Sequence, residues 1–187
     1  MSGILQALLT GGARVTTWNP ADTNAGITLS NGNLTATANS GTDNICARAS
    51  VFRSDIRQFE VTIVAEVEAF YPGIALGNAS ASLSTFPGSD NNGIGFNGNN
   101  TGNLGGAPIA GPGFTWTAGD VITVAYDGAA KTLRLAKNGG AFSSAYDVSV
   151  ISGAVAPMMY TAAIGDSLTA NFGASAFTKP GVQSWNG

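Results

Sequence analysis

The segment Gly119–Gly140 constrains the fold more strongly than any other part of the sequence. In its first half Ile122, Val124 and Tyr126 alternate with smaller or more polar residues, which is typical of a strand that buries one face. Asp127-Gly128 then favours a turn. In the second half apolar residues again take every second position, and an Asn-Gly pair, which tolerates positive φ in a two-residue turn, closes the segment. The segment predicts a β-hairpin, an element more typical of scaffolds that bind than of scaffolds that react.

Other stretches have the same strand-and-turn character. Gly26–Thr37 predicts a second hairpin, and Gln58–Glu68 alternates over its whole length. Shorter strands are expected at Gly73–Asn78, Pro157–Ile164 and Ser167–Gly173. Beyond the amino-terminal residues no segment has a convincing helical period. Many short strands and glycine-rich turns predict an all-β chain folded as an antiparallel β-sandwich.

The composition excludes several functional classes. Charged residues make up 10% of the chain, against about 25% in ordinary soluble domains, and the formal net charge is -3. Because no cluster of Lys and Arg could neutralise phosphates, nucleic acid is not an expected partner. No apolar run approaches the ~20 residues of a membrane span, so we expect none.

The chain contains no histidine and a single cysteine, Cys46. Without histidine, a Ser-His-Asp or Cys-His nucleophile, a His-ligated zinc and the usual general base at neutral pH are excluded. A lone cysteine forms no intrachain disulfide, and Cys46 is expected to be a buried apolar residue. We therefore expect no catalytic residue, no metal and no cofactor, and any enzyme would depend on carboxylates alone.

Residues 1–14 differ from the rest, and we interpret them as an amino-terminal arm before a single domain at residues 15–187. Four apolar residues of the arm could form one face of a short helix, which would end at Thr10-Gly11-Gly12. They are Ile4, Leu5, Leu8 and Leu9. The arm lacks the basic region and the cleavage site of a signal peptide. Because a helix this short is marginal alone, the arm either packs on its own domain or docks into a partner.

Five motifs of the chain occur in a distinctive order. They are Trp18–Thr37, Phe59–Ile63, Gly73–Asn99, Gly119–Gly140 and Pro157–Gly173. In this order they resemble the SPRY family of concanavalin-like β-sandwiches, which are built from two curved antiparallel sheets. The resemblance covers most of the chain, from about Trp18 to Phe177. The WNPAD opening and the LSTFPGSD loop are similar to the variety found in bacteriophage tail and fibre proteins.

This resemblance implies a binding or structural module without catalysis, because SPRY domains generally present loops at one end of the sandwich to a peptide, protein or glycan. It further implies a virion structural protein on the exterior of a phage tail, baseplate, fibre or capsid. Such a protein would dock on other virion proteins through the arm, be displayed as a homo-oligomer and contribute to binding of a host-surface glycan or protein. Two alternatives stay open: a capsid decoration protein without a receptor role, and a free lectin-like module that binds carbohydrate or protein.

Recognition residues are expected in the long middle loops, because loops on a rigid sandwich commonly carry binding sites. The candidates are Phe86, Asp90, Asn91, Asn92, Phe96, Asn97 and Asn99. The same loops could equally be plain solvent-exposed connections. For assembly, the candidates are the four apolar residues of the arm and Trp185, which we expect to be exposed. Trp18 and Trp116 are expected to pack at the end of the sandwich and at a hairpin entry.

Two further motifs receive a structural interpretation. Glu60, Glu66 and Glu68 share one face of a predicted strand, and retaining glycosidases need a carboxyl pair about 5 Å apart. Because Val67 is expected to point inward and no aromatic cluster lies nearby, a solvated strand face is favoured. Ser89–Gly93 lacks the closing glutamate of a calcium loop, so a turn is favoured there.

Overall fold

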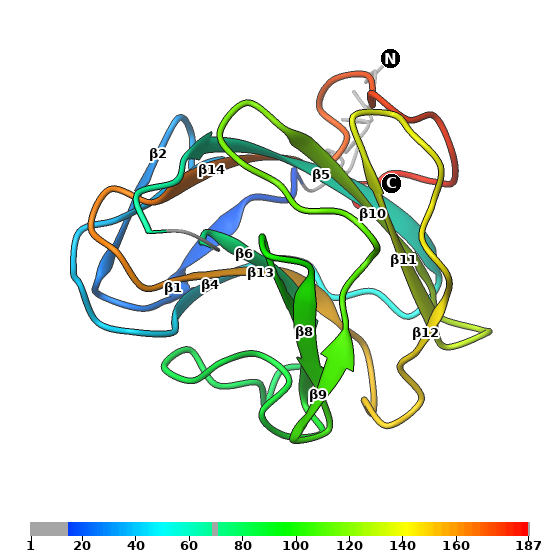
Figure 1. The fold of residues 1–187 in the computed structure, drawn as a ribbon. Coiled ribbons are helices and arrows are strands. Elements are labelled where there is room, and N and C mark those ends of the chain that lie inside the picture. Colours follow the sequence, from blue (N-terminus) through cyan, green and yellow to red (C-terminus); the bar gives the residue numbers. More distant parts are fainter. Residues whose placement is uncertain (1–14, 69–70, 187) are drawn as a thin grey trace, which may run out of the picture.

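The computed structural model describes residues 15–68 and 71–186, so the arm residues Ile4, Leu5, Leu8 and Leu9 lie outside the described part of the chain. The described residues form fourteen strands and no helix. The strands make two antiparallel sheets of seven strands each, which face one another as a sandwich (Figure 1). The predicted all-β sandwich is confirmed. Within these ranges there is accordingly no helix that could cross a membrane.

The first sheet has the strand order β1-β4-β13-β6-β7-β8-β9. Its strands are β1 (Trp18–Thr23), β4 (Ile45–Ala49), β13 (Ala156–Thr161), β6 (Gly73–Gly77), β7 (Gly93–Asn97), β8 (Thr101–Leu104) and β9 (Ala107–Ala110). The second sheet has the order β12-β11-β10-β5-β14-β3-β2. Its strands are β12 (Tyr146–Asp147), β11 (Thr132–Lys137), β10 (Val121–Asp127), β5 (Ile56–Ala65), β14 (Ser167–Asn171), β3 (Thr35–Ala38) and β2 (Ile27–Ser30). Strands far apart in sequence are thus neighbours, and loops from distant parts of the chain meet at each end of the sandwich.

Apolar side chains from both sheets fill the space between them. The alternation predicted for β5 is confirmed at Phe59, Val61 and Ile63, which are buried. Phe172, just after β14, lies against Trp18 and Phe59, with ring centroids 5.2 and 6.1 Å apart. Burying an aromatic ring of this kind contributes on the order of 2 kcal/mol. This aromatic cluster joins the two sheets at the centre of the molecule.

The hairpin predicted from Gly119–Gly140 is confirmed. β10 and β11 pair antiparallel in unbroken register, and the alternate apolar residues of β10 are buried. Asn138 and Gly139 have φ values of 51° and 73°, and the Gly140 N–H donates to the Lys137 carbonyl at 2.9 Å. Positive φ at both central residues is the signature of a type I′ turn.

Two strands end earlier than the sequence predicts. β5 ends at Ala65 and β13 ends at Thr161. As a result Val67, expected to point inward, and Ile164, expected within a strand, are each 63% exposed. The prediction for Val67 is wrong because its backbone N–H bonds to the carboxylate of Asp166, outside any strand ladder.

Candidate binding surfaces

The long middle loop, residues 78–92, packs on the outer face of the first sheet. The ring of Phe86 lies 4.7 Å from that of the fully buried Tyr160, measured between centroids. Cys46 belongs to the same small apolar cluster, which confirms that it is a buried residue. Burial raises the pKa of its thiol to about 12. The loop therefore extends the core, and the partly buried Phe86 is a packing residue.

The structure divides the other loop candidates into two groups. Asp90, Asn91 and Asn92 precede β7. Asn97 is the last residue of β7, and Asn99 lies in the turn that follows. Five steps of extended chain separate Asn92 from Asn97, which corresponds to about 16 Å. These residues therefore do not form one compact site.

Two of the middle-loop residues have a structural function. Phe96 lies within β7, is 1% exposed and packs on Tyr146 with ring centroids 4.7 Å apart. Its prediction as a ligand-binding residue is wrong, because the strand directs its ring into the core. The carboxylate of Asp90 accepts hydrogen bonds from the backbone and the side chain of Asn92, each at 2.8 Å. These bonds form the turn that the sequence favours over a calcium loop. Separately, the described residues contain no cluster of three or more His, Cys, Asp or Glu that could hold a metal ion.

Trp185 contradicts its prediction as an exposed docking residue. It is 0% exposed, and its ring packs on Phe59 and Tyr126 at centroid distances of 5.6 and 6.5 Å. Its indole N–H donates to the Val51 carbonyl at 2.8 Å. The carboxyl-terminal residues return to the sandwich and insert this ring into its core, so Trp185 cannot anchor a partner.

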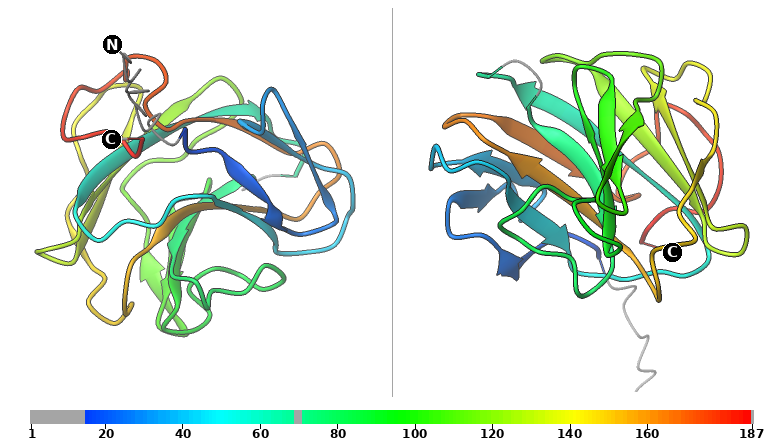
Figure 2. Two further views of the ribbon diagram at one scale, coloured as in Figure 1. Left: turned by 180° about the vertical axis from the view of Figure 1, so that it is seen from behind. Right: turned by 60° about the horizontal axis from the view of Figure 1, so that its bottom comes forward.

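Residues 172–186, called here the C-terminal segment, pack against the first half of β5 (Figure 2). The Glu60 carboxylate accepts hydrogen bonds from the N–H groups of Thr178 and Lys179, at 2.9 and 3.0 Å. It also accepts one from the Thr123 hydroxyl at 2.8 Å. Glu60 is consequently 3% exposed. The prediction of a solvated face is wrong for Glu60, because the C-terminal segment covers it.

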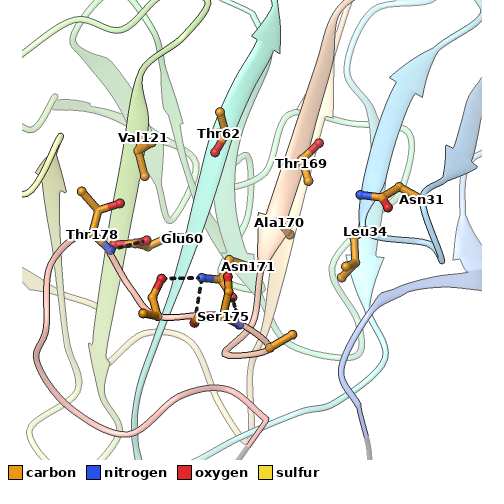
Figure 3. Close-up of a pocket in the computed structure, with 12 residues that line it drawn as sticks. Asn31, Leu34, Glu60, Thr62, Val121, Thr169, Ala170, Asn171, Ser175 and Thr178 are labelled. Carbon is orange, nitrogen blue, oxygen red and sulfur yellow. Dashed lines mark hydrogen bonds between the residues drawn. The ribbon is translucent and has the colours of Figure 1, made fainter.

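The C-terminal segment forms one wall of a groove on the outer face of the second sheet (Figure 3). The groove has a volume of about 360 Å³, and Thr62 and Thr169 line it from β5 and β14. Asn171 shapes the wall, because its side chain accepts a hydrogen bond from the Gly173 N–H at 3.0 Å and donates one to the Ser175 carbonyl at 3.2 Å. The groove is thus preformed by the chain itself.

A second surface lies at one end of the sandwich and is called here the loop end. It is formed by residues 39–44, 66–68 and 162–166. Val67 and Ile164 are its exposed apolar residues. A β-carbon placed on Gly165 would lie 3.1 Å from the Val67 side chain, and one on Gly41 would lie 4.0 Å from Ile164. The three loops are therefore neighbours, and Val67 and Ile164 are exposed on two of them.

A buried carboxylate, Asp166, ties the loop end together. One of its oxygens accepts the Val67 N–H at 2.8 Å, and the other accepts the Thr161 hydroxyl at 2.7 Å and the Ala163 N–H at 3.2 Å. Its backbone carbonyl accepts the Ala38 N–H at 2.9 Å. Because Asp166 is 0% exposed, these bonds are shielded from water and hold the loops in one arrangement.

The loop end is acidic as well as apolar. Burial, and then the negative charges of Asp43 and Glu68, raise the pKa of the Tyr71 phenol. Glu66 and Glu68 follow the end of β5, so they do not share a strand face with Glu60. Aliphatic side chains beside carboxylates suit a partner that offers apolar and basic groups.

Sequence reasoning missed both surfaces. Val67 occupies an alternate position with the buried residues of β5, so a continued strand would place it inside. The Gly165-Asp166 pair, which indicates a turn, is the one sequence signal for a loop whose carboxylate could bond to the Val67 backbone. Thr62 and Thr169 look like ordinary outward residues of amphipathic strands. No signal in the sequence indicates that the C-terminal segment crosses this face.

Comparison with known proteins identifies the family. A family model described as the SPRY domain matches residues 56–175, which is more than half of the chain. The chain belongs to the SPRY family. SPRY domains are generally non-catalytic protein-interaction modules. No curated protein matches the sequence of this SPRY chain.

Solved SPRY structures share its fold at low sequence identity. The SPRY domain of human HERC1 has a TM-score of 0.67 and 17% identity, over 82% of this chain and 96% of that one. The TRIM65 PSpry domain has a TM-score of 0.66 and 12% identity, over 84% and 92% of the two chains. Stonustoxin has a TM-score of 0.67 and 14% identity, and the match covers 83% of this chain but 27% of the stonustoxin chain. The predicted SPRY-type sandwich is confirmed by this likeness of fold.

Proposed function

We propose that this SPRY domain is a non-catalytic binding module whose loop end docks on a protein partner. The observation that carries the proposal is the exposure of two aliphatic residues, Val67 and Ile164, on neighbouring loops that Asp166 holds in place. Apolar side chains that cluster on a surface and are rimmed by polar groups are typical of protein interaction sites. The lack of histidine and the burial of Glu60 under its own chain support the absence of catalysis.

The chemistry of the loop end favours a particular class of partner segment. Val67 and Ile164 would supply affinity by contact with an aliphatic or aromatic side chain. Asp43 and Glu68 would favour lysine or arginine beside that anchor and would disfavour acidic segments. The partner segment is therefore a short stretch that combines one apolar anchor with basic neighbours.

Selection from a randomised peptide library on the immobilised domain tests this proposal. We expect the selected peptides to be enriched in Lys or Arg next to an apolar residue. Their binding should be lost in Val67→Asp and Ile164→Asp, because a carboxylate would replace the apolar contact. Val182→Asp is the matched control, since Val182 is 43% exposed on the C-terminal segment, away from the loop end. Peptides without this enrichment, or peptides that bind the loop-end variants normally, would refute the proposal.

We further propose that the domain is displayed on the exterior of a bacteriophage particle and contacts a host-surface protein there. The support is the resemblance of the WNPAD opening and the LSTFPGSD loop to phage tail and fibre proteins, together with the sparse charge of the chain. Residues 1–14 would attach the domain to other virion proteins. Symmetric particles carry several copies of such subunits.

Deletion of residues 1–14 tests the display. Mass spectrometry of purified particles should show loss of the shortened protein, while the purified domain keeps its peptide binding. Incorporation at the normal level would contradict docking through the arm. The copy number in unmodified particles separates the remaining alternatives, because decoration proteins are numerous and host-binding proteins are few. Binding in solution without any particle association would instead support a free module.

A further inference from the structure

A row of hydroxyl groups crosses the outer face of the second sheet and leads into the groove of Figure 3. Ser30 pairs with Thr35, and Thr35 pairs with Thr169. Thr169 in turn pairs with Thr62, on the floor of the groove. Because neighbouring strands lie about 4.8 Å apart, the row is about 14 Å long. The row and the groove form one continuous polar track across four strands.

Hydrogen bonds between strands orient two hydroxyls of this track and two in the row beside it. Thr35 and Thr169 share a hydrogen bond of 2.7 Å, and Thr37 and Ser167 share one of 2.8 Å in the row beside it. Each hydroxyl has one donor and two acceptor positions, so acceptors remain for a ligand. Threonine is common on outward strand faces for reasons of packing alone. The groove at the end of the row is a separate observation that points to a ligand, because the C-terminal segment gives it a defined wall.

The groove offers no accessible charge. Glu60 is the only carboxylate among the residues that line it, and its oxygens already accept three hydrogen bonds from the chain. The remaining lining consists of hydroxyls, amides and aliphatic carbons such as those of Leu34 and Val121. A charged ligand would lose hydration here without gaining an ionic partner. An uncharged polar ligand has a smaller penalty, which hydrogen bonds to the hydroxyls and amides of the groove offset.

We propose that the groove and the hydroxyl row bind a neutral polysaccharide chain. One sugar unit would occupy the groove, and the adjoining units would follow the row. A sugar ring presents both C–H groups and hydroxyls, which matches the mixed aliphatic and hydroxyl lining. Nucleic acid would require grouped cations that this face lacks. The site is separate from the loop end, and the inference does not rest on the protein partner proposed there.

The affinity of a single site is expected to be low. No aromatic ring lines the groove to stack on a sugar, so the Kd for one chain should be on the order of 1 mM. Several copies on one particle would raise the effective affinity through simultaneous binding. A weak site of this kind is found by titration at high ligand concentration.

Nuclear magnetic resonance titration of the isotope-labelled full chain tests the inference. The probes are maltohexaose and chitotetraose as neutral oligosaccharides and hexagalacturonate as an anionic one. We expect at least one neutral probe to shift the amide signals of Thr62, Thr169, Asn171 and Ser175, with no such shift from hexagalacturonate. Thr62→Val and Thr169→Val should each raise the Kd about 5-fold, the equivalent of one lost hydrogen bond. Valine keeps the shape and the strand preference of threonine, so the fold should persist.

Thr132→Val, on β11 of the same sheet but beyond the row, is the matched control and should leave the Kd unchanged. Peptide binding at the loop end should also be unchanged in all three variants, which separates the two sites. The inference is overturned if no neutral probe shifts these signals at tens of millimolar. It is equally overturned if the anionic probe shifts them as strongly, or if the two threonine variants bind like the unmodified chain.

Discussion

The outer faces of the two sheets are covered by different kinds of contact. On the first sheet, residues 78–92 rest on an apolar cluster around Phe86 and Tyr160. On the second sheet, the C-terminal segment is held by hydrogen bonds to the buried Glu60 and by the ring of Trp185. Apolar contacts tolerate changes of shape, whereas a buried carboxylate needs each of its partners in place. The buried Arg48 also donates to the Asn78 and Ala81 carbonyls, at 2.6 and 3.0 Å, and gives residues 78–92 a polar anchor. The comparison teaches that the two coverings differ in the charge of this anchor. A buried cation donates to carbonyls on the first sheet, whereas a buried carboxylate accepts N–H groups on the second and so fixes the groove wall.

Trp185→Ala should have the largest effect, because it removes the apolar anchor of the C-terminal segment. We expect a loss of about 3–5 kcal/mol in the free energy of unfolding, as for other buried aromatic residues. Urea denaturation measures the loss. Val182→Ala in the same segment is the control and should change the free energy by less than about 0.5 kcal/mol. A loss below about 1 kcal/mol for Trp185→Ala would mean that the segment is not part of the core.

Glu60→Gln should cause the second-largest loss in the free energy of unfolding. The glutamine amide must direct an N–H group toward N–H or O–H donors that the carboxylate accepts, so at least one buried donor loses its partner. We expect a loss of about 2–3 kcal/mol in the free energy of unfolding. Glu68→Gln at the exposed loop end serves as the control, with little expected change. Equal effects of the two substitutions, measured by denaturation, would mean that the buried Glu60 carboxylate does not hold the C-terminal segment in place.

Phe86→Ala should cost less, about 1–2 kcal/mol, because the ring is only partly buried. Its more specific consequence concerns Cys46, whose thiol pKa is raised to about 12 by burial in the same cluster. In the unmodified chain this thiol should resist alkylation at pH 8. Phe86→Ala should accelerate the alkylation, followed by mass spectrometry. An unchanged rate would show that residues 78–92 do not cover the cluster.

Acidification should cause the smallest loss of stability, because it weakens the pair of Asp55 and Arg57 at the edge of the C-terminal segment. Arg57 hydrogen-bonds Asp55 and also donates to the Ser184 carbonyl at 2.9 Å. The hydrogen bond from Arg57 lowers the pKa of Asp55 from its ordinary value of 3.8. The resulting stability is present above pH 3.8 and is lost as pH falls through the lower folded-state pKa. Asp55 is largely exposed, so Asp55→Asn should cost under about 1 kcal/mol at pH 6, and the cost should shrink as the pH falls toward 2.

A difference as large at pH 2 as at pH 6 would contradict this account of Asp55. Denaturation of both proteins at the two pH values, at constant salt, makes the comparison. Arg57 remains charged throughout, so the change reports the carboxyl group.

Much of the fold was predictable because it depends on local patterns. The hairpin of β10 and β11 follows from alternation and from the turn that begins at Asp127-Gly128, and these signals lie within one short segment. The functional surfaces were not predictable in the same way. Glu60 has the parity of a solvated residue, and only the return of Thr178 to β5, more than a hundred residues later, buries it.

The same distinction explains the errors at individual residues. Trp185 lies in a stretch without strand alternation, so nothing local indicates that its ring enters the core. The glycine and asparagine residues around Phe96 favour a loop, but β6 provides a partner strand there. Residues whose environment is made by distant segments require the structure.

Hydrogen exchange at the amides of Thr178 and Lys179 tests most directly whether Glu60 holds the C-terminal segment and the groove wall in place. The account predicts that both amides are protected in the unmodified chain nearly as strongly as the core strands. It predicts that Glu60→Gln removes this protection while the amides of β10 and β11 keep theirs. Rapid exchange at Thr178 and Lys179 in the unmodified chain, at the rate of exposed loops, would contradict it.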